Sequence, residues 1–72
     1  MDYKSVFKAR LRLLRKELGE TQAQVASALG IRESHYQKFE LGSNLPSFSN
    51  FLALADHFGV SLDYLAGRTD QR

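Results

Sequence analysis

Five hydrogen-bonding side chains in the middle of the chain could recognise the edges of nucleic acid bases. They are Arg32, Glu33, Ser34, Gln37 and Lys38. Arg and Lys can donate to guanine O6 and N7, Gln can pair with adenine through two hydrogen bonds, and Glu can accept from cytosine N4. The same composition is typical of the solvent-facing side of any surface helix. Composition alone therefore leaves base recognition and a plain polar face as two open interpretations.

Catalytic and metal-binding arrangements are not supported by the sequence. His35 and His57 fall on different expected helices, Asp56 directly precedes His57, and no nucleophile is placed with a base and an orienting group. A glycine-rich phosphate loop is absent from the sequence. A structural zinc site needs four Cys or His ligands, and the chain has no Cys and only 2 His. We expect no enzyme activity, no metal, no cofactor and no small-molecule substrate, with Asp56 and His57 on the polar side of a helix.

The length and charge of the chain restrict its class. With 72 residues, of which 43% are hydrophobic and 25% charged, it fits one small globular domain. The net charge is only +2, but residues 1–18 carry six Lys and Arg against two acidic residues, a local charge of +4. A basic amphipathic helix could also lie on a membrane. Because the N-terminus lacks a signal peptide and no segment reaches the roughly 20 apolar residues of a membrane span, we expect a cytoplasmic protein.

The first half of the chain predicts two helices that would position the polar group. Apolar residues recur at a spacing of 4, 3 and 4 positions, which places Phe7, Leu11, Leu14 and Leu18 on one helix face. This helix is expected over residues 4–18 and ends before a glycine. Residues 21–24 (TQAQ) fit a capping box, so a second helix of about eight residues should begin there and end at Gly30.

The second half predicts three more helices in quick succession. One covers residues 32–41 and carries the polar group. The next begins at the cap Ser47, contains the most apolar segment of the chain, and is expected to be central to the core. A short last helix begins at the cap Ser61 and ends at Gly67. No segment alternates polar and apolar residues long enough for a strand, so the fold class is all-α, with one domain over residues 1–67 and a tail over residues 68–72.

Two short helices joined by a glycine turn are the geometric unit of the helix-turn-helix. Several segments, in order and at the right spacing, resemble the Cro/repressor (XRE) family of phage and bacterial regulators over most of residues 7–67. They are residues 21–26 (TQAQVA), 29–31 (LGI), 39–42 (FELG), 46–47 (PS) and 58–65 (FGVSLDYL). The resemblance implies a compact five-helix, lambda-repressor-like fold, with helices two and three as the helix-turn-helix. It also implies a homodimer that binds a palindromic operator in double-stranded DNA and represses transcription, as a prophage repressor would.

The resemblance also assigns roles to individual residues. It places the bases against Arg32, Glu33, Ser34, Gln37 and Lys38. Further residues are expected to have the following roles: Gln22, Ser43 and Asn44 contact phosphates, Arg15 and Glu40 form a structural ion pair, and Leu62, Tyr64 and Leu65 are candidates for the dimer interface. Ser43 and Asn44 could equally form a simple polar turn. Gln22 could be a plain first-turn residue.

The chain departs from the family pattern at two positions of the third helix. The family usually has Ser or Thr at the helix cap, whereas Arg32 offers no side-chain acceptor, so Ser34 or the DNA would have to compensate. Tyr36 replaces an aliphatic residue, and we expect its ring to lie partly at the DNA surface. Arg10 and Arg12 are expected to be solvated, although either could touch phosphate.

A second interpretation keeps the fold and changes the function. The domain could be a protein-interaction module, similar to an antitoxin that neutralises a partner and binds DNA only secondarily. Antitoxins usually add a segment that folds on the partner, whereas only residues 68–72 follow the last expected helix.

Overall fold

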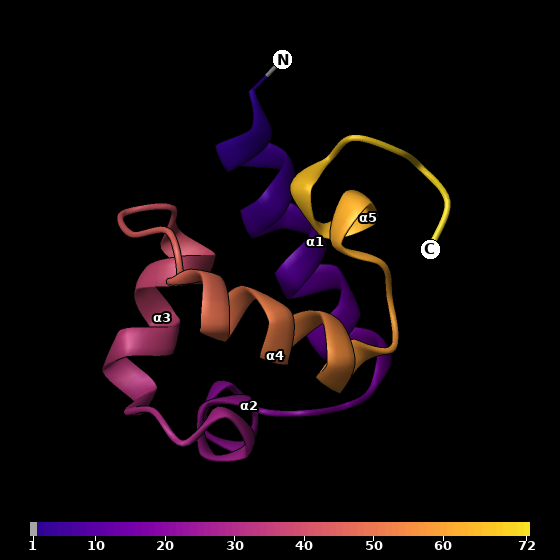
Figure 1. The fold of residues 1–72 in the computed structure, drawn as a ribbon. Helices are drawn as coiled ribbons and strands as arrows, with labels where there is room; N and C mark the ends of the chain where they lie inside the picture. Colours follow the sequence, from indigo (N-terminus) through magenta and orange to yellow (C-terminus); the bar gives the residue numbers. More distant parts are fainter. Residues whose placement is uncertain (1) are drawn as a thin grey trace.

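The computed structural model describes residues 2–72, so Met1 lies outside the described residues. Within this range the chain forms α1 (Tyr3–Glu17), α2 (Gln22–Leu29), α3 (Glu33–Leu41), α4 (Phe48–Phe58) and α5 (Leu62–Ala66). No strand occurs in residues 2–72, so the predicted all-α class is confirmed. Figure 1 shows α4 crossing in front of α1, while α2 packs against α3 and α5 packs against α1. None of these helices is both long and apolar enough to cross a membrane.

Three helices begin at the side-chain caps that the sequence predicts. The Thr21 hydroxyl accepts from the backbone N–H of Gln24 at 3.1 Å, and the Gln24 side chain accepts from the N–H of Thr21 at 2.8 Å. Ser47 and Ser61 cap α4 and α5 through one such bond each. By contrast, Arg32 stands at the N-cap of α3 and makes no side-chain cap bond. The first N–H groups of α3 therefore lack the side-chain acceptor that most helix starts have.

The turn between α2 and α3 depends on Gly30. Its backbone has a φ of 71°, in the left-handed region that side chains with a Cβ rarely adopt. The following N–H, of Ile31, bonds back to the carbonyl of Ala26 at 3.0 Å, and the Ile31 side chain packs against the core. The two helices are therefore joined by only three residues, which fixes α3 across α2.

Residues from all five helices meet in one core. The buried hydrophobic residues in the described range are Phe7, Leu11, Leu14, Val25, Ala26, Tyr36, Phe39, Leu54, Ala55, Tyr64 and Leu65. Two apolar segments contribute less to the core than their sequence pattern suggests. Leu18 is 55% exposed because α1 ends at Glu17, and the chain turns away there. In α4, only Leu54 and Ala55 are fully buried, whereas Phe48 at its start is 71% exposed, so α4 covers the core from one side.

Arg10 connects α1 to α5 and to the C-terminal tail, so the expectation that it is solvated was wrong. Its guanidinium donates to the carbonyl oxygens of Tyr64 and Thr69 and pairs with Asp70 at 2.9 Å. The same group lies 4.1 Å from the centre of the Tyr64 ring. Only 16% of the Arg10 side chain is exposed. We call this set of contacts the Arg10 clasp.

The Arg10 clasp predicts a stability difference between two arginines of the same helix. We expect Arg10→Met to lower the free energy of unfolding by about 1.5 to 3 kcal/mol, since it removes hydrogen bonds from a charged donor and keeps the apolar stem. Arg12→Met is the control, because Arg12 is exposed and makes no hydrogen bond or ion pair within residues 2–72. It should change stability by less than about 0.5 kcal/mol. Denaturant unfolding measures both, and equal stability of the two variants would contradict the clasp.

Candidate nucleic-acid interface

The outer face of α3 carries the five residues that the sequence singled out. Arg32, Glu33, Ser34 and Lys38 are exposed and Gln37 is half-buried. The Gln37 amide donates to the Glu33 carboxylate at 3.4 Å, one helical turn away. No other hydrogen bond involves these side chains in the described range, so their donors and acceptors remain open to a ligand.

The inner face of α3 explains why these five side chains point outward. Tyr36 and Phe39 are both 0% exposed and hold the helix to the core, and their rings meet nearly edge to face, 6.1 Å apart. The expectation that the Tyr36 ring lies partly at the surface was therefore wrong. The ring fills the position of an aliphatic residue, and its hydroxyl finds a partner inside the protein.

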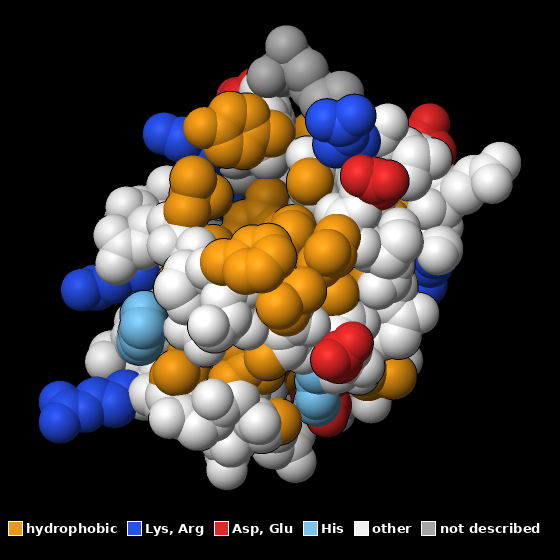
Figure 2. All heavy atoms as spheres, in the orientation of Figure 1, with side chains coloured by type: hydrophobic (Ala, Val, Ile, Leu, Met, Phe, Trp, Pro, Cys, Tyr) orange, Lys and Arg blue, Asp and Glu red, His pale blue; other side chains and the backbone are white. Residues whose placement is uncertain are grey.

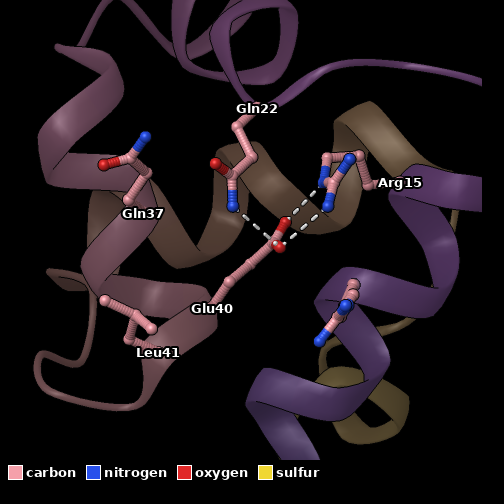
Figure 3. Close-up of a pocket in the computed structure, with 6 residues that line it drawn as sticks. Arg15, Gln22, Gln37, Glu40 and Leu41 are labelled. Carbon is pink, nitrogen blue, oxygen red and sulfur yellow. Dashed lines mark hydrogen bonds and ion pairs between the residues drawn. The ribbon is translucent and has the colours of Figure 1, made fainter.

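That partner belongs to a cluster of Arg15, Gln22, Tyr36 and Glu40, which we call the Glu40 cluster. Arg15 and Glu40 form the expected ion pair through two bonds of 2.7 and 3.0 Å. Gln22 donates to the same carboxylate at 3.2 Å and the Tyr36 hydroxyl donates at 2.6 Å. Figure 3 shows the side chains of Gln22 and Arg15 converging on Glu40 from two different helices. The carboxylate thus joins α1, α2 and α3.

The cluster perturbs the ionisation of its members. Partial burial of Glu40 opposes its charged form, but hydrogen bonds from Arg15, Tyr36 and Gln22 outweigh this cost and hold the pKa of Glu40 below its usual 4.5. Burial, and then the bond to Glu40, raises the pKa of Tyr36. The bond to Glu40 also raises the pKa of Arg15 against the effect of desolvation. The cluster is therefore a charged pair with neutral donors around it.

Gln22 is held by the protein itself, which the sequence did not predict. Its side chain lies at the start of α2 and points toward Glu40. A side-chain amide has two N–H donors, so one remains after the bond to Glu40.

The i, i+4 spacing of Tyr36 and Glu40 was the signal that could have revealed the cluster, because residues four apart share a helix face.

An open groove brings the start of α2 and the outer face of α3 together. It has a volume of about 390 Å³ and is lined by Arg12, Arg15, Gln22, Gln37, Glu40 and Leu41. Beyond α3, Ser43 and Asn44 are exposed in the loop, where the Ser43 hydroxyl donates weakly to the Lys38 carbonyl at 3.4 Å. The predicted base-contacting residue Gln37 and the predicted phosphate-contacting residue Gln22 therefore face one hollow surface.

Two of the three candidates for the dimer interface do not lie on the surface. Tyr64 is 6% exposed and Leu65 is 0% exposed, whereas Leu62 is half-buried. The helix α5 has only five residues, and its apolar side chains are used to cover α1. The placement of Tyr64 and Leu65 at a dimer interface was wrong for this reason.

Comparison with known sequences identifies the family. The sequence model of the helix-turn-helix family matches residues 11–65, which is more than half of the chain. The chain therefore belongs to the helix-turn-helix family, in its Cro/repressor class. The matched range includes the whole Glu40 cluster and both helices of the turn.

Several curated proteins share this region. The cryptic phage CTXphi transcriptional repressor RstR of Vibrio cholerae is 43% identical over 61 residues, covering 85% of this chain and 54% of that protein. The SPbeta prophage-derived uncharacterized HTH-type transcriptional regulator YonR of Bacillus subtilis is 35% identical over 83% of this chain and 56% of its own length. AnsR, an HTH-type transcriptional regulator of the same organism, is 38% identical over 88% of this chain and 54% of its own length. The chain thus spans about half the length of the curated relatives it matches. No solved structure matches at a significant level.

The Glu40 cluster predicts a pH-dependent stability difference. Glu40→Gln removes the charge and leaves Arg15 without its partner, so we expect a loss of about 3 kcal/mol at neutral pH. Tyr36→Phe removes one hydrogen bond only and should cost about 1 kcal/mol.

The sign of the pH effect follows from the lowered pKa of Glu40. The ionised Glu40 carboxylate stabilises the fold fully at pH values above its unfolded pKa of 4.5. This stabilisation is lost as the pH falls through the lower pKa of the folded state. The stability gap between the wild-type protein and Glu40→Gln should therefore shrink on acidification, measured by denaturant unfolding between about pH 7 and pH 3. A gap that stays constant over this range would contradict the assignment.

Proposed function

We propose that this domain binds double-stranded DNA sequence-specifically and acts as a homodimeric transcriptional repressor at a palindromic operator. The observation that carries the proposal is the outer face of α3, where five polar side chains remain open to a ligand while the opposite face is fully buried. In helix-turn-helix proteins the second helix of the unit enters the major groove. Repression is supported by the name of the CTXphi relative.

In this proposal, α3 reads the base edges. Arg32 and Lys38 donate to guanine, Gln37 pairs with adenine, Glu33 accepts from cytosine N4, and Ser34 adds a donor or acceptor of either kind. The Glu33–Gln37 bond of 3.4 Å orients the Gln37 amide before it meets DNA. The uncapped N–H groups at the start of α3 can donate to an acceptor on the DNA.

Phosphate contacts would hold the helix in register. Gln22 donates its remaining N–H to a phosphate, because its other N–H is fixed by Glu40. Asn44 and Ser43 in the loop after α3 contact the backbone from a second point. Such contacts fix the orientation of the protein and do not themselves carry sequence information.

The role of Glu33 supplies a sharp test, because it is an acidic residue placed against a polyanion. Selection of bound sites from random DNA first defines the preferred sequence. We then expect Glu33→Gln to lose discrimination at one base pair, by about 1 to 3 kcal/mol, while binding unrelated DNA as well or better. Competition binding with operators changed one pair at a time measures this.

The control is Asp56→Asn, which removes one exposed negative charge from α4, away from the reading face. This variant should strengthen binding to all sequences about equally, through charge alone. If Glu33→Gln behaves in the same way, Glu33 has no part in base reading and only stabilises the start of α3 through the helix dipole.

An exposed apolar patch offers a surface for the second copy. It consists of Tyr3, Leu45, Phe48 and Leu52, with exposed fractions of 52%, 47%, 71% and 39%. Figure 2 shows hydrophobic side chains gathered on the face where α4 lies in Figure 1. Contiguous exposed apolar patches of a few hundred Å² on monomers are often functional. A stable interface buries about 800 Å² per partner, so the patch would form the apolar centre of a dimer contact.

The patch predicts the effect of one charge on self-association. We expect the wild-type protein to sediment as a dimer and Phe48→Glu to sediment as a monomer, since a charge at the centre of an apolar contact would be buried without a partner. Leu41→Glu is the matched control, because Leu41 is 72% exposed but lies outside the patch. Analytical ultracentrifugation distinguishes the three proteins. A dimer that survives Phe48→Glu would exclude this surface.

A further inference from the structure

Three basic side chains form a row along α1. Lys8, Arg12 and Lys16 are four residues apart and line one wall of a groove between α1 and the end of α3. The groove has a volume of about 550 Å³, and its other lining residues are Ala9, Leu13, Glu40 and Leu41. We call Lys8, Arg12 and Lys16 the basic row.

This groove continues the surface that carries Gln22 and Gln37. Arg12, Glu40 and Leu41 line both hollows. A linear polyanion that passes Gln22 would therefore meet Arg12 next and then the rest of the basic row.

The charges of the basic row are not used within the protein. Four other arginines have carboxylate partners in the described range: Arg10 with Asp70, Arg15 with Glu40, Arg68 with Asp63 and Arg72 with Glu17. Within residues 2–72, Lys8, Arg12 and Lys16 take part in no ion pair of this kind. The one carboxylate that lines the groove, Glu40, is already paired with Arg15.

One member of the row is held in place by packing. A Cβ added to Gly42 would lie 2.9 Å from the Cδ of Lys8, so the Lys8 stem passes directly over this glycine. Gly42 ends α3, where the helix dipole favours a cation. Lys8 thus stands at the junction between the groove and the loop that carries Ser43 and Asn44.

We propose that the groove between α1 and α3 holds the sugar-phosphate backbone of duplex DNA just outside the bases that α3 reads, with the basic row neutralising the phosphates of this flanking DNA. This inference rests on the proposed DNA binding and extends the contact surface beyond α2, α3 and the loop. Four residues of a helix rise about 6 Å, so the row presents a positive charge about every 6 Å along α1. The row therefore complements a chain of phosphates in charge.

The test uses Arg12→Gln, Lys16→Gln and the double variant. Arg68→Gln is the matched control, since it removes the same charge at the end of α5, where the side chain is 77% exposed. Binding is measured against salt concentration on two duplexes: the selected site with about one helical turn of flanking DNA on each side, and the same site trimmed of its flanks. Thermal unfolding of every variant confirms that the fold is intact.

Each substitution removes one phosphate contact per subunit and therefore two per homodimer. On the flanked duplex the slope of log K against log salt should become shallower by about 1.8 for each substitution and by about 3.6 for the double variant. The preferred bases should not change, and the difference should largely disappear on the trimmed duplex. Arg68→Gln should keep the wild-type slope. An unchanged slope in the double variant overturns the inference while leaving DNA binding by α3 intact. Equal losses on both duplexes overturn it as well, and a wild-type protein that binds neither duplex overturns the proposed function itself. If the double variant keeps the wild-type slope on DNA but loses binding to an acidic protein, the basic row serves a protein partner instead.

Discussion

The arrangement of α1, α2 and α3 depends on the hydrogen bonds that the carboxylate of Glu40 accepts. This carboxylate accepts four hydrogen bonds, two from Arg15 and one each from Tyr36 and Gln22. Its position is costly in isolation, because it lies in the last turn of α3, where the helix dipole disfavours an anion, and it is largely withdrawn from water. The donors offset this cost. Since they come from α1, α2 and α3, the angle between the two helices of the turn is set by directional bonds as well as by apolar packing.

The same cluster prepares the surface that faces a ligand. An unpaired carboxylate beside the start of α2 would repel phosphates, whereas the Arg15–Glu40 pair has no net charge. The bond from Gln22 to Glu40 also fixes a side chain that would lose conformational freedom on binding. Stability and function are therefore linked at this position. A change that loosens Glu40 affects the orientation of α3 before it affects any contact that α3 makes.

The parts of the structure that could be predicted from the sequence are those with local signals. The capping box at Thr21, the caps Ser47 and Ser61 and the glycine stops placed all helices within one or two residues, because each signal acts over a single turn. The outward direction of the polar residues of α3 followed from the same periodicity.

Contacts between distant residues were the ones that sequence reasoning missed. Arg10 finds its partners 54 to 60 positions away, and His57 contacts Glu20 at 2.7 Å although it was expected on a plain polar face. Nothing in the local pattern distinguishes such residues from solvated ones. The apolar residues of α5 pose the reverse problem. The sequence shows that Tyr64 and Leu65 are apolar, but it does not show whether they are covered by the core of their own chain or by a second copy. In the folded domain the core of the same chain covers them.

The distribution of charge explains how a chain with a net charge of +2 can suit a polyanion. Among residues 2–72, five of the acidic side chains are paired with a basic or imidazole group: Glu17, Glu20, Glu40, Asp63 and Asp70. These pairs hold the tail, α4 and α3 in place and largely cancel one another beyond a Debye length. The basic side chains without such partners gather on α1 and α3, so the field outside the protein is more positive on that side than the total suggests. Glu33 is then the acidic residue that stands out on the reading face, because repulsion from phosphates acts on it without any internal cation to offset it. A negative charge in that position weakens binding to DNA in general and is useful only where it distinguishes one base from another.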